Sequence, residues 1–184
     1  MSAARIRERL AAVAPGQAPP GLVRAAVLVP LLARPEGTTV IFTRRADHLS
    51  DHAGQISFPG GRVEARDRGP VATALREAGE EIALAADRVE VLGRLPICDT
   101  TTGFAVVPVV GLVAPPVELA PDPTEVAEIF EVPLAFLLDP ANRRLVCRPD
   151  GRETHVLDYD GRVIWGATAR MIVDLGEVIG PCAA

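Results

Sequence analysis

The chain has 184 residues, 48% of them apolar, and its 19 basic and 24 acidic residues give a net charge of −5. This length favours a single domain with a sizeable core, and the acidic balance argues against a nucleic-acid-binding protein. The longest apolar run, 25–33, is far shorter than the about 20 residues that span a membrane. Three cysteines without a Cys-x-x-Cys pair favour a reducing compartment, so we expect a cytoplasmic protein that neither enters a membrane nor binds nucleic acid.

The first half of the chain is predicted to form a helix, a hairpin, a long loop and a second helix. Apolar residues near helical spacing open the chain, and a segment rich in Pro and Gly follows them. Two apolar runs separated by Pro35-Glu36-Gly37 favour a hairpin, and Pro70 suits the first position of a helix. In chain order we predict a helix within 1–14, a linker at 14–21, strands at 24–34 and 38–45, a loop at 46–58 that could end in a strand, a turn at 59–61 and a helix at 70–84.

The second half is predicted to be richer in strands. Two Asp-Gly pairs, Asp150-Gly151 and Asp160-Gly161, lie between strand-like segments and favour two hairpins. Because strands and helices are mixed without regular alternation, the predicted fold class is α+β with a mixed sheet. The other elements, in order, are strands at 89–95 and 104–113, a Pro-rich loop at 115–123, a strand at 126–132, a short helix at 133–138 and a helix at about 166–175.

Three glutamates of the helix at 70–84 form the most informative pattern in the sequence. At 100° per residue, Glu77, Glu80 and Glu81 fall within an arc of about 100° on one side of the helix. Such a cluster suits Mg²⁺ or Mn²⁺, which prefer hard oxygen ligands, although a solvated acidic face is the plain alternative. Arg76 is four residues from Glu80 and can pair with it. The opposite side is expected to be buried, and it carries Ala72, Leu75, Gly79 and Ile82.

A glycine turn precedes this helix, and together the two resemble the signature of the Nudix hydrolases. In Phe58-Pro59-Gly60-Gly61 the backbone can approach phosphate oxygens closely. Gly61 takes the first place of the signature, and the run from Arg76 to Leu84 takes its end. Ala83 stands where the family usually has Gly, and the spacing from Gly61 to Arg76 is one residue longer than usual. The middle acid of the signature therefore stays open between Glu64 and Asp67.

Segments on both sides of the signature are similar to those of coenzyme A pyrophosphatases. The segment from His48 to Gly61 is typical of that subfamily, although Ser50 stands where many members carry Arg. The run Ile164-Trp165-Gly166-Ala167-Thr168-Ala169 also matches, and the likeness spans 22–176. It implies the Nudix fold, a mixed sheet between helices, in one domain over 1–184 with an N-terminal helix and linker at 1–21.

The resemblance implies metal-dependent hydrolysis of the pyrophosphate of coenzyme A or its derivatives. The products would be 3′,5′-ADP and 4′-phosphopantetheine or its acyl form, with Mg²⁺ or Mn²⁺ as cofactor, and a homodimer is expected. Two alternatives stay open. The chain could hydrolyse another diphosphate, such as ADP-ribose or a dinucleoside polyphosphate, or it could be a Nudix-fold binding module without catalysis.

Site roles follow from the same resemblance. Glu77 and Glu81 would ligate the metal, and Glu80 would do so directly or through water. Arg76 would hold Glu80 or the loop, and Glu125, after a Pro-rich loop, is the candidate base. The predicted catalytic set is therefore Arg76, Glu80, Glu81 and Glu125, and the predicted substrate contacts are Gly60, Gly61, Arg44 and Arg62.

Other polar and aromatic residues are given structural roles at this stage. His48 and His52 are assigned to the loop because no further zinc-type ligand accompanies them. Cys98 is expected to be buried and inert. Trp165 is expected to pack in the core, and residues 99–102 are expected to form a plain turn.

Overall fold

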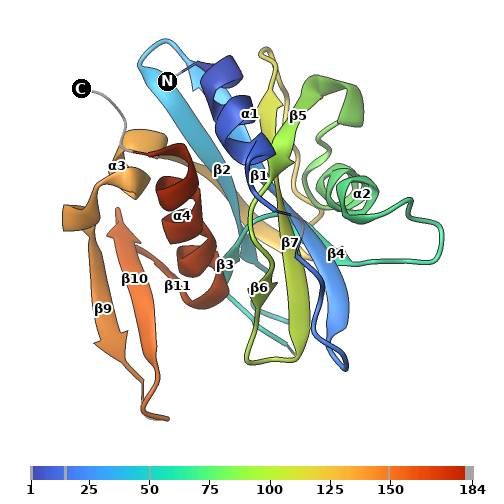
Figure 1. Ribbon diagram of the computed structural model, residues 1–184. Helices are drawn as coiled ribbons and strands as arrows, with labels where there is room; N and C mark the ends of the chain where they lie inside the picture. The colour runs from blue at the N-terminus through green and yellow to red at the C-terminus, as the bar shows by residue number, and fades with distance from the viewer. Residues whose placement is uncertain (1, 15, 50, 149, 181–184) are drawn as a thin grey trace.

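The computed structural model describes residues 2–14, 16–49, 51–148 and 150–180 (Figure 1). One large sheet and one small sheet contain all the strands of this described part. The strands of the large sheet are β1 (Val23–Arg34), β2 (Gly37–Arg45), β3 (Ile56–Ser57), β4 (Gly60–Arg62), β5 (Val89–Arg94), β6 (Cys98–Asp99), β7 (Phe104–Val113) and β8 (Val126–Pro133). The strands of the small sheet are β9 (Arg143–Cys147), β10 (Glu153–Tyr159) and β11 (Arg162–Trp165).

Helices cover both faces of the large sheet. They are α1 (Ala3–Ala11), α2 (Pro70–Ile82), α3 (Leu134–Leu138) and α4 (Gly166–Ile179), with short 3-10 turns at Ala86–Arg88 and Pro140–Asn142. One apolar cluster joins α1, α3 and α4 to one face of the sheet, and a second joins α2 to the other face. The arrangement predicted from the sequence, a mixed sheet between helices in an α+β fold, is therefore confirmed (Figure 1).

The large sheet mixes parallel and antiparallel pairs. Its order is β3-β2-β1-β7-β5, and in addition β4 pairs with β1, β6 with β7 and β8 with β2. β1 and β7 run parallel, which accounts for the continuous apolar character of both strands, since a central parallel pair is buried on two faces. The predicted hairpin at Pro35-Glu36-Gly37 joins β1 to β2, and the two Asp-Gly pairs lie in the β9–β10 and β10–β11 connections.

The prediction of a turn at 59–61 is wrong. Gly60 and Gly61 belong to β4, which pairs antiparallel with β1 opposite Val27 and Ala26. A β-carbon at Gly60 would lie 2.4 Å from the Ala26 carbonyl oxygen, so only glycine lets the two strands meet at this distance. Pattern reasoning also missed the two-residue strand β6 and ended α4 four residues early. No helix in the described part of the chain is long and apolar enough to cross a membrane.

Candidate active site

Two of the three glutamates of α2, Glu77 and Glu81, lie on the side of the helix that meets the sheet. Glu81 is only 4% exposed, and the Glu77 side chain is 15% exposed, whereas that of Glu80 is half exposed. Of the predicted buried face, Ile82 is buried and Leu75 is partly buried against the core, whereas Ala72 is only partly covered and Gly79 is exposed. The residues that α2 buries are Thr73, Ala74, Ala78, Glu81 and Ile82. The acidic cluster is consequently not a solvated face but a partly buried group at the helix–sheet interface.

Strand β4 holds two of these carboxylates at close range. A β-carbon at Gly61 would lie 2.3 Å from Glu77 Oε1, so the bare glycine leaves the space that the Glu77 carboxylate fills. The Gly60 backbone N–H faces the Glu81 carboxylate and favours its ionised form. The two glycines thus bring β4 against β1 on one side and against the carboxylates of α2 on the other.

Arg76 and Asp67 fix the loop that leads into α2. Arg76 Nε donates to Asp67 Oδ1 and Nη2 to Asp67 Oδ2, both at 3.1 Å, and Asp67 also accepts from the Thr73 hydroxyl at 2.8 Å. This pairing holds the pKa of Asp67 well below its usual range. Arg76 Nη1 donates to Glu80 at 2.7 Å, and Nη2 donates to the Arg62 carbonyl at 3.2 Å. Arg76 therefore holds both Glu80 and the loop, the two roles that the sequence had left open.

Negative charge accumulates around Glu81. Burial and the neighbouring carboxylates Glu77 and Glu125 raise the pKa of Glu81 to about 8, against the smaller effects of the Gly60 N–H and of Arg45. Burial also raises the pKa of Glu77, and Arg76 opposes that rise. Since mutual repulsion and desolvation both disfavour the ionised cluster, a bound cation would relieve it.

Glu125 comes to this cluster from a distant loop. Its charge raises the pKa of both Glu77 and Glu81, so its carboxylate lies within electrostatic range of them. The loop is held to the C-terminal turn of α2, where the Asp122 N–H donates to the Glu81 carbonyl at 2.9 Å. The Ala46 N–H donates to the Glu125 carbonyl at 2.9 Å. Glu125, the candidate base, is more than 40 residues from Glu77 and Glu81 in sequence, but folding brings its loop against the end of α2.

The donor set fits a hard divalent cation. Glu77, Glu80 and Glu81 offer carboxylate oxygens, the ligand type that Mg²⁺ and Mn²⁺ prefer, and Glu125 adds a further carboxylate within electrostatic range. In the described residues no three His, Cys, Asp or Glu side chains already converge at ligating distance. Glu77 Oε1 instead lies 3.0 Å from Arg76 Nη2. To bind a cation, the Glu77 carboxylate would therefore exchange this ion pair for the metal.

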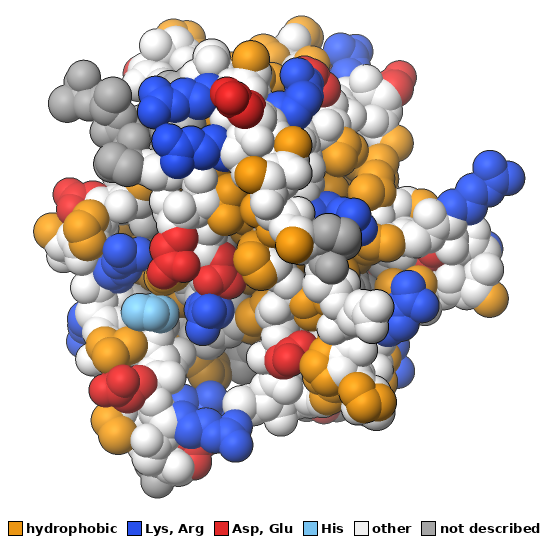
Figure 2. Space-filling model, viewed as in Figure 1, with side chains coloured by type: hydrophobic (Ala, Val, Ile, Leu, Met, Phe, Trp, Pro, Cys, Tyr) orange, Lys and Arg blue, Asp and Glu red, His pale blue; other side chains and the backbone are white. Residues whose placement is uncertain are grey.

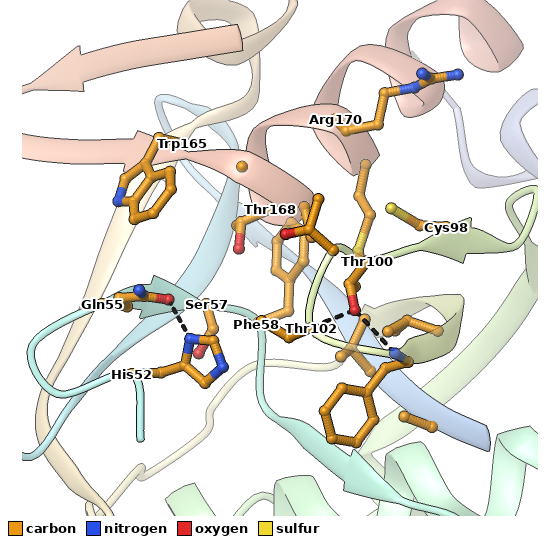
Figure 3. A pocket seen from close by; sticks show the side chains of 18 of the residues that line it. His52, Gln55, Ser57, Phe58, Cys98, Thr100, Thr102, Trp165, Thr168 and Arg170 are labelled. Atoms are coloured by element: carbon orange, nitrogen blue, oxygen red, sulfur yellow. Dashed lines mark hydrogen bonds between the residues drawn. The ribbon is translucent and has the colours of Figure 1, made fainter. Parts of the chain in front are cut away.

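A cleft of about 1350 Å³ opens beside β4, although none of Glu77, Glu80, Glu81 and Glu125 lines it. Gly60, Gly61, Arg62 and Arg45 line one end of it, and the small sheet, the β6–β7 loop and the start of α4 form the rest. Figure 3 shows Trp165 on one side of the cleft and His52, hydrogen-bonded to Gln55 at 2.9 Å, on the other. Its volume exceeds the 300–1,000 Å³ typical of small-molecule sites, so an extended ligand fits.

Arg44 and Arg62 were predicted to contact substrate, but only Arg62 lines the cleft. Arg62 lines the cleft, with its guanidinium carbon 5.3 Å from the centre of the Phe104 ring. Arg44 does not line it but donates to Asp47 at 2.7 Å and lies 3.7 Å from Glu128. Arg45 takes that place because the pairing of β2 with β8 shifts between these two residues, and such a bulge redirects side chains.

Three further expectations concern residues near the cleft. Trp165 was expected in the core, but it is 38% exposed and lines the cleft. The turn expected at 99–102 is present at Thr101 and Thr102, after Asp99 of β6, and these residues also line the cleft. His48 Nε2 lies 3.1 Å from the Thr124 carbonyl, beside the Glu125 loop, and thus has a structural contact. Cys98 is buried, which raises the pKa of its thiol to about 11. Ser50 lies outside the described residues.

Comparison with known proteins agrees with this geometry. The family model for the NUDIX domain matches residues 22–148. An uncharacterized Nudix hydrolase, NudL, of Yersinia pestis (strain Pestoides F) is 42% identical over 159 residues, covering 85% of this chain and 79% of the relative. The chain belongs to the Nudix hydrolase family, a class of pyrophosphatases that act on phosphorus anhydrides in nucleoside diphosphate derivatives.

Solved structures share the fold at lower identity. A Nudix hydrolase of M. smegmatis, RenU, aligns with a TM-score of 0.53 and 24% identity, over 62% of this chain and 72% of that one. A MutT/nudix family protein of Enterococcus faecalis aligns with a TM-score of 0.54 and 16% identity, over 90% of this chain and 64% of that one.

Proposed function

We propose that this Nudix hydrolase cleaves the pyrophosphate bond of coenzyme A or its derivatives, giving 3′,5′-ADP and 4′-phosphopantetheine or its acyl form. The observation that carries the proposal is the buried Glu81 cluster, which contacts strand β4, together with a large cleft that Gly60, Gly61 and Arg62 of the same strand line. The cluster provides a cation site for a diphosphate. The volume of the cleft leaves room for both the nucleotide and the pantetheine arm of such a substrate.

Each residue of the site has a proposed role. Glu77, Glu80 and Glu81 are the proposed ligands of Mg²⁺ or Mn²⁺, which when bound would offset the charge of the diphosphate and activate water as a nucleophile. Arg76, fixed by Asp67, keeps Glu80 and the loop in place. Arg62 projects into the cleft next to Gly61, where it can bind a phosphate oxygen.

Glu125 is the proposed base. Glu125 is exposed and within electrostatic range of Glu77 and Glu81, so its carboxylate can face a water molecule at the mouth of the site. In the proposed step the water oxygen attacks one phosphorus, its proton passes to a Glu125 carboxylate oxygen, and the bond to the bridging oxygen breaks. The leaving phosphate takes the electron pair of that bond.

Three further features accompany the proposal. We propose that residues 1–184 form one Nudix domain, with 22–176 as its core and 1–21 as an N-terminal helix and linker. The packing of Leu10 of α1 against Gly93 of β5 supports this unit. The homodimer and the cytoplasmic location expected from the sequence stay predictions.

A substrate panel tests the proposal. Purified protein is incubated with coenzyme A, ADP-ribose and a dinucleoside polyphosphate, each with Mg²⁺, with Mn²⁺ and with a chelator, and kcat/KM is compared. We expect the highest value for coenzyme A and none with chelator. A higher kcat/KM for another diphosphate would support the metal site but contradict coenzyme A as the substrate. If none of the compounds is hydrolysed, the result would favour a binding module without catalysis.

A further inference from the structure

Where the β9–β10 hairpin and the start of α4 line the cleft, charged and aromatic side chains lie together. Arg148 and Arg152 lie at the end of the β9–β10 hairpin, and Trp165 lies where β11 meets α4. All three line the cleft. Figure 2 shows arginine side chains gathered at the lower end of the molecule, over this hairpin, next to a hollow.

The two arginines lie opposite each other across the hairpin. Cys147 is paired with Glu153 in the register of β9 and β10, and the Arg148 N–H donates to the Arg152 carbonyl at 2.7 Å. Residues opposite each other in an antiparallel pair project from the same face, and like charges in that position destabilise it. An anion bound between the two guanidinium groups would remove this repulsion.

The local acids do not neutralise this pair. Asp150 Oδ2 lies 3.7 Å from Arg148 Nη2, and within the described residues Arg152 has no carboxylate within 4 Å. The acids that line the cleft are Asp51, Asp99 and Glu153, against the arginines Arg45, Arg62, Arg148, Arg152 and Arg170. Of these arginines, Arg170 is paired with Asp174 at 2.8 Å. The end of the β9–β10 hairpin can therefore accommodate an anionic group of a ligand.

The indole completes the surface. The Arg148 guanidinium carbon lies 5.9 Å from the centre of the Trp165 ring, and the ring is 38% exposed. In Figure 3 the indole stands at the edge of the cleft rather than among the core side chains. An exposed aromatic face beside a cation offers stacking to a nucleobase and a contact to a phosphate attached near it.

We propose that Arg148, Arg152 and Trp165 form a subsite for the phosphorylated nucleoside end of the substrate. The two arginines bind a phosphate monoester on the ribose, and Trp165 stacks on the base. The subsite makes the enzyme prefer diphosphates that carry this third phosphate. The proposal rests on the proposed function for the position of the scissile diphosphate, but it concerns residues that the carboxylate cluster does not use.

A fluorescence titration tests the subsite without turnover, because Trp165 is the only tryptophan of the chain. Protein in chelator is titrated with 3′,5′-ADP and with 5′-AMP, which differ only in the 3′-phosphate. We expect both to change the Trp165 emission, with 3′,5′-ADP binding about tenfold more tightly or better, as charge-assisted hydrogen bonds to phosphate predict. Equal affinities, or no change in emission with either ligand, would overturn the proposal.

Variants assign the effect to the arginines. The double variant Arg148→Ala/Arg152→Ala is expected to bind 3′,5′-ADP no more tightly than 5′-AMP. Arg144→Ala, an exposed arginine of the same hairpin that does not line this cleft, is expected to keep the difference. A preference that survives in the double variant would show that other groups hold the phosphate and would overturn the assignment.

Kinetics separate this proposal from the proposed function. The double variant is expected to raise KM for coenzyme A and to leave kcat and the KM for dephospho-coenzyme A unchanged. Absence of coenzyme A turnover with retained 3′,5′-ADP preference would reject the proposed function and keep the subsite. Turnover of both substrates with equal kcat/KM would reject the subsite and keep the hydrolase.

Discussion

Gly61→Ala is the sharpest test of the packing between β4 and α2. The added β-carbon would lie 2.3 Å from Glu77 Oε1 and 2.5 Å from its Cδ, whereas ordinary contacts begin near 3.4 Å. The carboxylate must therefore move by about 1 Å, and a misplacement of this size costs about a hundredfold in rate. We expect kcat/KM for coenzyme A to fall about a hundredfold, equivalent to about 2.7 kcal/mol of transition-state stabilisation, while the melting temperature changes by no more than about 4 °C.

Gly79→Ala is the matched control, because Gly79 lies on α2 between Glu77 and Glu80. Its added β-carbon would meet only the Leu84 carbonyl oxygen, at 3.7 Å. Alanine is favoured over glycine inside a helix by about 1 kcal/mol, so this variant should be at least as stable as the parent and equally active. Gly61→Ala with activity within threefold of the parent would refute the reasoning, and so would an equal loss in both variants.

The remaining predictions address the charged groups. Glu81→Gln should keep the fold without metal, because a neutral amide avoids burying charge. Its metal-dependent turnover should fall more than about a hundredfold, measured by steady-state kinetics and by the loss of the melting-temperature rise with Mg²⁺. Asp67→Asn should lower stability at pH 7. Since the folded pKa of Asp67 is depressed, its stabilisation is present above the unfolded value near 4 and is lost as pH falls toward the folded pKa, so the gap between the two melting temperatures should close below pH about 4. A gap that is constant from pH 7 to 3 would contradict this. Glu125→Gln should lower kcat by about 10²-fold or more with KM unchanged, and parental kcat would exclude it as the base.

Strands and helices with strong periodicity were predictable from the sequence. β7, a long apolar run, was predicted at its observed limits, and the Asp-Gly pairs gave both hairpins of the small sheet. Short strands were not predictable, because β4 and β6 are formed by pairing with long strands that are distant in sequence. Gly60 looked like a turn residue, yet its missing side chain serves close strand packing.

The parts of the site formed by residues close together in sequence were predictable, and the parts formed by distant segments were not. The spacing of Glu77, Glu80 and Glu81 placed the carboxylates together, but periodicity assumed that charged residues face solvent and so left Glu81 out of the buried face of α2. The exposed position of Trp165 was also missed, since a single aromatic residue carries no periodic signal. The cleft is assembled from five separate segments of the chain, and only their folding together makes it visible.

The most direct measurement is product analysis of coenzyme A incubated with the purified protein and Mg²⁺. The account predicts 3′,5′-ADP and 4′-phosphopantetheine in equal amounts from the parent protein, and neither product from Glu81→Gln or in the presence of a chelator. Intact coenzyme A after incubation with the parent protein, or equal product from Glu81→Gln, would contradict it.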